Sequence, residues 1–75
     1  MMPIDVLFRY GLAPGERELR ALASAWEVYG IRRIRFDETE HTVRVEYDGT
    51  RLTEAAVASL LRNAGIDVRE RVALV

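Results

Sequence analysis

Hydrophobic residues follow two different periods along the chain, and these periods predict six elements. Four stretches alternate apolar and polar residues, which is typical of strands that bury one face. These predicted strands cover residues 3–10, 32–37, 42–47 and 66–75. Two other stretches repeat apolar residues with the spacing of a helix that buries one face. The buried faces are predicted to hold Leu19, Leu22, Ala23 and Trp26 in a first helix, and Val57, Leu60, Leu61 and Ala64 in a second.

The residues at the ends of these stretches suit helix ends and turns. Pro14 suits the first turn of the first helix, and Gly30 is expected to end it. Thr53 is expected to cap the N-terminus of the second helix, and Gly65 to end that helix. The polar residues 37–42 predict a hairpin loop between the second and third strands.

The predicted order of elements is β-α-β-β-α-β, in a chain of 75 residues, which is enough for one domain. In each half, a helix is followed by Gly-Ile and then by a strand. Two right-handed units of this kind interleave into a four-stranded antiparallel sheet with both helices on one face. We therefore predict a single α+β domain, a ferredoxin-like sandwich over residues 1–75 with an ordered core at about 3–72 and one sheet face open to solvent.

Composition narrows the classes of partner. Hydrophobic residues make up 49% of the chain and charged residues 31%, which is typical of a folded protein. The net charge of −1 argues against binding of nucleic acid, which a basic domain favours. All 11 basic residues are arginine. Codon usage in a GC-rich genome accounts for this simply, and the functional alternative is that guanidinium groups recognise carboxylates or phosphates.

The sequence predicts a cytosolic protein. Asp5 and Arg9 interrupt the apolar residues near the N-terminus, so no secretion signal is expected. No stretch approaches the ~20 apolar residues of a membrane span, so no membrane partner is expected. Cysteine is absent, which excludes disulfides and thiolate metal ligands.

Three segments follow a known arrangement of glycine and apolar residues. Residues 30–36 read Gly-Ile-Arg-Arg-Ile-Arg-Phe, residues 43–48 read Val-Arg-Val-Glu-Tyr-Asp, and residues 63–68 read Asn-Ala-Gly-Ile-Asp-Val. Over residues 4–70 the chain thereby resembles the heavy-metal-associated domain family, which includes small copper chaperones and the N-terminal modules of metal-pumping ATPases. The resemblance rests on packing and turn positions, so it implies the fold better than the activity.

The loop that binds metal in this family is different here. The family has Gly-Met-x-Cys-x-x-Cys between the first strand and the first helix, whereas residues 11–17 read Gly-Leu-Ala-Pro-Gly-Glu-Arg. Leu12 replaces a methionine that fills the core in the family. Pro14 and Arg17 stand at the two thiolate positions, and neither side chain can ligate a metal. The resemblance therefore implies a domain whose thiolate metal site has been lost, and no cofactor is expected.

Other metal ligands are few. His41 is the only histidine and follows the acidic residues Asp37, Glu38 and Glu40, which together could hold zinc or copper weakly. One histidine does not complete a closed site, so a solvated polar hairpin is the simpler interpretation. The methionines at positions 1 and 2 could bind Cu(I), but they lie at the chain end, where disorder is common.

Other proteins with the same order of elements suggest alternatives. RNA-binding modules stack bases on aromatic residues of the open face, but Phe8 and Tyr47 are predicted to face the core. An acylphosphatase-like enzyme would need a suitable arginine loop and a strand asparagine, and Asn63 is the only asparagine, near a helix end. No nucleophile or acid–base pair indicates an enzyme. A small-molecule-sensing dimer of the ACT type remains open.

Two surfaces are candidates for binding. The open sheet face is predicted to carry Arg9, Arg33, Arg35, Arg44, Arg69 and Arg71, interleaved with Asp5, Glu46 and Asp67. Cross-strand ion pairs that keep the sheet solvated are the simpler interpretation, and docking of an acidic partner by Arg33, Arg35, Arg44, Arg69 and Arg71 is the functional one. The last strand would overhang the helices with an apolar end, and Val72 and Leu74 are its candidates for edge-to-edge association.

The function predicted from the sequence is that of a non-catalytic binding module. A protein partner is expected, and a homodimer through the last strand is one form of it. The alternatives are a copper- or zinc-binding accessory protein with ligands other than cysteine, and the ACT-like sensor.

Overall fold

The computed structural model of the chain describes residues 2–25 and 30–74. Its elements are β1 (Pro3–Tyr10), α1 (Glu16–Ala25), β2 (Ile31–Asp37), β3 (Thr42–Asp48), α2 (Glu54–Asn63) and β4 (Val68–Val72). The predicted order of strands and helices is therefore confirmed. Trp26, which the helical spacing assigns to the buried face of the first helix, lies outside the described residues.

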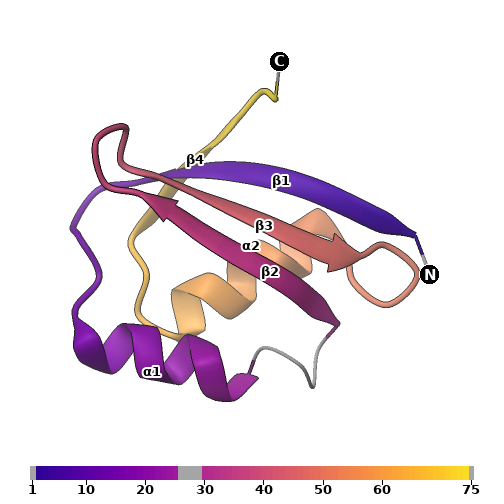
Figure 1. The fold of residues 1–75 in the computed structure, drawn as a ribbon, viewed down its shortest axis with the longest axis horizontal. Coiled ribbons are helices and arrows are strands. Elements are labelled where there is room, and N and C mark those ends of the chain that lie inside the picture. The colour runs from indigo at the N-terminus through magenta and orange to yellow at the C-terminus, as the bar shows by residue number, and fades with distance from the viewer. Residues whose placement is uncertain (1, 26–29, 75) are drawn as a thin grey trace.

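The four strands form one antiparallel sheet in the order β2-β3-β1-β4, with β2 and β4 at its edges (Figure 1). Helix α2 runs behind the sheet in this view, and α1 lies beside the β2 edge. This α+β architecture, with a four-stranded antiparallel sheet and two helices, is consistent with the predicted ferredoxin-like fold.

The core lies between one face of the sheet and the helices. The strands bury alternate residues on that face, Val6, Phe8 and Tyr10 in β1 and Val43, Val45 and Tyr47 in β3. The helices add Leu22 from α1 and Val57, Ala58 and Leu61 from α2. Because a strand turns successive side chains to opposite faces, the residues between these positions project to the other face, which stays open.

Both ends of α2 have the predicted caps. The Thr53 hydroxyl oxygen accepts a hydrogen bond from the Ala56 N–H at 3.1 Å. At the other end Gly65 has a φ of +98°, and the N–H groups of Gly65 and Ile66 donate to the carbonyls of Arg62 and Leu61. This double hydrogen bond ends the helix at Asn63 and turns the chain toward β4.

Helix α1 buries less of its apolar face than the periodicity predicts. Leu22 is buried, but Leu19 is 42% exposed and Ala23 is exposed as well. These side chains line a groove of about 210 Å³ together with Ile34 and Phe36 of β2. The groove follows from the position of α1 at the β2 edge, where the sheet covers only part of the helix.

The prediction that the last strand continues to residue 75 was wrong. β4 ends at Val72, and the chain then leaves the sheet (Figure 1). A β-bulge interrupts its pairing with β1, because Val68 lies opposite Tyr10 whereas Glu70 lies opposite Arg9. The extra residue reverses the alternation after Val68. Glu70 therefore reaches the open face rather than breaking the apolar side of the strand.

None of the helices in the described ranges is long and apolar enough to span a membrane.

Candidate functional site

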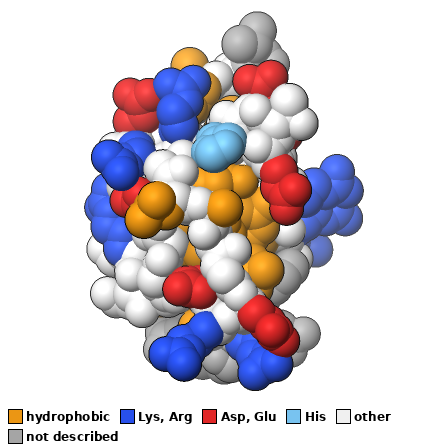
Figure 2. Space-filling view, turned by 90° about the vertical axis from the view of Figure 1, so that its left-hand side faces the viewer, with side chains coloured by type: hydrophobic (Ala, Val, Ile, Leu, Met, Phe, Trp, Pro, Cys, Tyr) orange, Lys and Arg blue, Asp and Glu red, His pale blue; other side chains and the backbone are white. Residues whose placement is uncertain are grey.

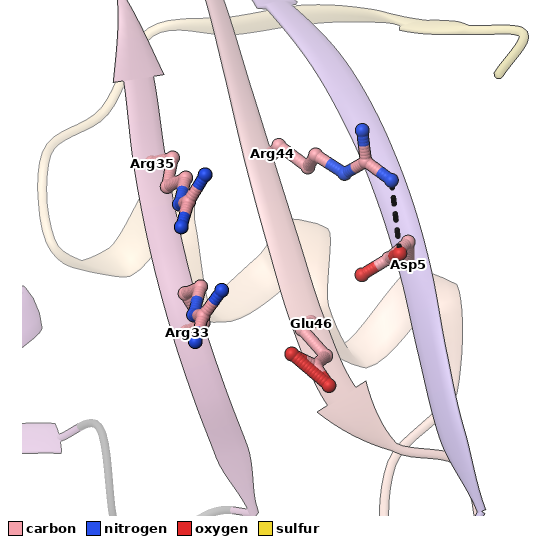
Figure 3. Close-up of a pocket in the computed structure, with 5 residues that line it drawn as sticks. All are labelled: Asp5, Arg33, Arg35, Arg44 and Glu46. Carbon is pink, nitrogen blue, oxygen red and sulfur yellow. Dashed lines mark hydrogen bonds and ion pairs between the residues drawn. The ribbon is translucent and has the colours of Figure 1, made fainter.

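A shallow pocket of about 280 Å³ lies on the open face of the sheet (Figure 3). It is lined only by charged side chains, namely Asp5, Arg33, Arg35, Arg44 and Glu46. We call Arg33, Arg35 and Arg44 together the basic face. Their strands are neighbours in the sheet, so residues far apart in the sequence share one surface.

Strand geometry explains why these side chains gather there. In β2, Ile34 and Phe36 are half-buried toward the core, and the alternation turns Arg33 and Arg35 outward. A second bulge follows Ile31, which lies opposite Tyr47, so that Arg33 is the next paired residue and lies opposite Glu46. The bulge adds one residue, Arg32, beside the pocket.

The basic face is only partly neutralised. Arg44 donates a hydrogen bond to Asp5 at 3.0 Å, and the Arg32 Nε lies 4.0 Å from a Glu46 carboxylate oxygen. Within residues 2–25 and 30–74, Arg33 and Arg35 have no ion-pair partner, and their side chains project side by side from β2 (Figure 3). These two adjacent guanidinium groups thus form no ion pair in the described part of the chain, although Glu46 lies opposite Arg33 in the register.

The register adds an unfavourable contact at this site. Arg35 lies directly opposite Arg44 across β2 and β3. Opposite residues on one face of an antiparallel pair have Cβ atoms about 4.5–5.5 Å apart, and like charges at this distance are destabilising. Asp5 compensates Arg44, which leaves the Arg35 charge as the unfavourable member of the pair.

This arrangement suits binding of an anion. A guanidinium group presents a planar set of N–H donors that matches a carboxylate or phosphate, and two of them on a rigid strand fix the direction of the ligand. Arginine stays protonated at physiological pH, so it does not act as a base or nucleophile here. The arginines of this pocket are therefore suited to recognising an anion.

The other arginines predicted for this surface have local partners. Arg9 pairs with Glu70 at 2.5 Å on the open face. Arg69 pairs with Asp67 at 2.9 Å near the start of β4. These ion pairs agree with the simpler interpretation, in which paired charges keep the sheet face solvated. Exposed pairs of this kind contribute little to stability and need no ligand.

The prediction that Arg71 lies on the open face was wrong. Arg71 lies opposite Phe8 of β1, whose side chain is buried toward the helices, and it forms an ion pair with Glu54 at the start of α2. The bulge in β4 is the cause, because it shifts the alternation by one residue. Arg71 therefore belongs to the helical side of the sheet.

The bulge also determines where the predicted edge residues lie. Val72 is half-buried and lies opposite Leu7, and both line a second hollow on the open face of about 770 Å³. Leu74 is 42% exposed beyond the end of β4. Association through Val72 and Leu74 remains a prediction, now for an edge strand of 5 residues.

The loop at the family's metal position is held by Asp67. One carboxylate oxygen of Asp67 accepts from the Leu12 N–H at 3.0 Å and from Arg69, and the Asp67 carbonyl accepts from the Gly11 N–H. The Leu12 hydrogen bond, and then Arg69, lower the pKa of Asp67 below its usual value. Leu12 itself is 74% exposed, so it does not fill the core as the methionine does in the family that the chain resembles.

The two positions that would carry thiolates lie at the start of α1. Pro14 is half-buried and precedes the helix, and Arg17 is exposed in its first turn. In the described residues no group of three or more His, Cys, Asp or Glu side chains is placed to hold a metal ion.

His41 is exposed at the hairpin end, with apolar side chains next to it on this face (Figure 2). Its ring stacks on Tyr10 with centroids 5.3 Å apart, and its Nδ1 lies 3.3 Å from the Gly11 carbonyl oxygen. Burial of Tyr10, with a smaller contribution from Glu38, raises the pKa of its phenol. The contacts of His41 thus brace the hairpin against β1 and the loop that follows it.

Comparison with known protein families and with curated proteins finds no match for this chain.

Proposed function

We propose that this chain is a non-catalytic binding module whose basic face binds an acidic segment of a protein partner. The observation that carries the proposal is the pair Arg33 and Arg35, which line a shallow pocket and form no ion pair within the described residues, although Asp5 and Glu46 also line it. We further propose that the domain is a ferredoxin-like sandwich of the heavy-metal-associated type. The exchange of both thiolate positions for Pro14 and Arg17 supports recognition of partners rather than transport of metal.

The energetics of the face support a binding role. A like-charge pair such as Arg35 and Arg44 makes the isolated fold less stable, so packing gives no reason for this arrangement. An incoming carboxylate removes the repulsion and forms charge-assisted hydrogen bonds with both groups. The unfavourable interaction in the free protein therefore becomes favourable only when an anion is bound.

The shape and charge of the chain favour a protein segment over nucleic acid. The pocket lining contains five charged residues and no aromatic side chain on which a base could stack. The whole chain has a net charge of −1, so its long-range field does not attract a polyanion. A short acidic segment needs only the local positive potential at β2.

Titration of the full chain with a synthetic peptide tests this proposal. The probe is a short glutamate-rich peptide, and its control is the same peptide with glutamine at every glutamate. Amide chemical shifts in NMR are expected to move at β2 and β3 with the acidic peptide alone. Added salt is expected to weaken the binding, because exposed charges are screened.

Variants of the chain make the test specific. Arg33→Ser with Arg35→Ser is expected to remove binding of the acidic peptide. Arg17→Ser with Arg62→Ser removes the same charge from exposed helix positions and is expected to leave binding intact. Equal binding by both double variants would show that the basic face is not the site.

A further inference from the structure

The tip of the β2–β3 hairpin is an acidic counterpart of the basic face. Glu38 and Glu40 are exposed there, and neither has an ion-pair partner among residues 2–25 and 30–74. They are two residues apart in the sequence, as Arg33 and Arg35 are. The chain thus presents two unpaired acids and two unpaired bases on one molecule.

The tip is held in a defined shape. Asp37 Oδ1 accepts hydrogen bonds from the N–H groups of Thr39 and Glu40 at 3.0 and 3.1 Å, which closes the turn. His41 follows with a φ of +54°, and its carbonyl accepts from the Tyr10 N–H at 2.9 Å. A turn fixed in this way loses little conformational freedom when it binds.

The acidic tip and the basic face belong to one continuous surface. The second hollow on the open face is lined by Arg35 and Arg44 as well as by Glu38 and Glu40. Leu7 and Val72 add half-buried apolar side chains to its lining. This surface therefore has both charges and an apolar part, which is what a self-complementary interface requires.

Within the described residues no ion pair joins the two charged groups. Arg33 and Arg35 lie on β2, and the tip continues the same hairpin beyond the end of that strand. The β2–β3 pairing keeps the hairpin extended, so the tip points away from Arg33 and does not fold back onto it. The tip therefore remains available to meet such a pair on another molecule.

We propose that the acidic segment taken by the basic face is the hairpin tip of a second copy of this chain, so that two copies form a dimer through their open faces. This inference rests on the proposed function, since it names the partner of the same site. The two sheets stack with their β2 strands antiparallel. Each tip then lies over Arg33 and Arg35 of the other copy, and two-fold symmetry forms the contact twice.

The charges of the remaining pairs are compatible with this arrangement. Arg9 with Glu70, and Arg44 with Asp5, are neutral as pairs and can enter an interface without repelling a copy of themselves. Leu7 and Val72 would be covered by the partner. Because exposed ion pairs contribute little individually, the dimer is expected to be weak and sensitive to salt.

Sedimentation velocity with charge-reversed variants of the full chain tests the dimer. Wild type is expected to sediment increasingly as a dimer as its concentration rises at low ionic strength, and as a monomer at high ionic strength. The face variant R33E/R35E and the tip variant E38R/E40R are each expected to be monomeric. The control R17E/R62E changes the net charge as much as the face variant does and is expected to dimerise like wild type.

Mixing the two variants gives the decisive measurement. In an equimolar mixture, the reversed tip meets the reversed face, and the native tip of one variant meets the native face of the other. Both contacts are restored, so the mixture is expected to dimerise although neither variant does so alone. A mixture of folded variants that stays monomeric overturns the proposal.

Neutral variants keep the test valid if a reversed chain fails to fold in a thermal melt. R33S/R35S and E38S/E40S are each expected to weaken dimerisation of the full chain about tenfold or more, the size expected from loss of the exposed ion pairs in both contacts. Unchanged dimerisation of both serine variants overturns the proposal, as does a wild type that is monomeric at every concentration. If wild type is monomeric but binds the acidic peptide, the dimer alone is refuted. If wild type neither dimerises nor binds the acidic peptide, the proposed function is refuted too.

Discussion

Arg35 lies directly opposite Arg44 on the open face, and the replacement Arg35→Glu is expected to stabilise the protein while removing its affinity for acids. The substitution exchanges a repulsive cross-strand pair for an attractive one. It leaves the buried side of β2 unchanged, because Arg35 is exposed and its neighbours Ile34 and Phe36 carry the contacts with the core. Stability and binding should therefore change in opposite directions.

The size of the effect follows from the geometry of the pair. An attractive cross-strand pair contributes about 0.2–1 kcal/mol, and a directly opposed like-charge pair is unfavourable by a similar amount. The Arg44 side chain is 52% exposed and already pairs with Asp5, so solvent and competition reduce the change. We expect the free energy of unfolding to rise by about 1 kcal/mol, which raises Tm by roughly 4–8 °C in a domain of this size.

Thermal and urea unfolding of dilute protein, followed by circular dichroism, measure this change. Arg35→Gln removes only the repulsion and is expected to give about half the gain. Arg62→Glu makes the same change of net charge in the last turn of α2, where a cation is favourable, and is expected to lower stability slightly. A lower Tm for Arg35→Glu than for wild type would refute the cross-strand repulsion, and gains of equal size in both glutamate variants would indicate a general charge effect.

Three further predictions concern the N-terminal cap of α2, the stability of the protein at acid pH and the loop between β1 and α1. Thr53→Ala removes the cap of α2 and is expected to reduce the free energy of unfolding by about 1 kcal/mol in urea, whereas Thr53→Ser should retain most of it. Hydrogen bonds from Thr50 lower the pKa of Asp48 from 3.8 to about 2, so the stability that the Asp48 carboxylate contributes is present above pH 3.8 and is lost as the pH falls to about 2. Asp48→Asn should therefore make Tm less dependent on pH in that range, and an unchanged dependence of Tm on pH would contradict this. Pro14→Cys with Arg17→Cys is expected to create a Zn or Cu(I) site detectable by metal titration, while wild type serves as the control; no binding by a folded, reduced variant would show that the loop lacks the geometry of the heavy-metal-associated family.

The sequence predicts most of the fold because local rules and the buried pattern agree. Alternation identifies β1, β2 and β3 within one residue of their ends, and Thr53 and Gly65 mark the ends of α2 through hydrogen bonds that depend on short segments. At these positions the chemistry of a few neighbouring residues is enough to predict where an element begins or ends. The antiparallel sheet with two helices then follows from the order of elements.

The errors arise where pairing between distant segments decides the outcome. The bulge in β4 depends on its register against β1, and it moved Arg71 from the predicted open face to Glu54 of α2. The exposure of Leu12 depends on Asp67, which holds the loop from the other end of the chain. A periodic pattern contains neither kind of information.

The candidate site was predicted in part. Alternation placed Arg33, Arg35 and Arg44 on the open face, but it did not show which of them would find a partner. The opposition of Arg35 and Arg44 needs the exact register of β2 and β3, and the bulge after Ile31 shifts that register by one residue. The contrast between the unpaired Arg33 and the paired Arg9 is therefore a property of the folded chain.

The extra residue in β4 lets one short strand serve two surfaces. Val68 supports the interior, whereas Val72, an even number of positions later, meets solvent beside Leu7. If the same residues paired with unbroken alternation and no bulge, Glu70 would turn toward the interior, and Arg9 would lose its ion-pair partner on the open face. The number of residues in this strand, and not only their identity, is thus a constraint: one residue inserted or deleted between Glu70 and Val72 would exchange the faces of the residues that follow it, and should be tolerated less than the same change in the tail.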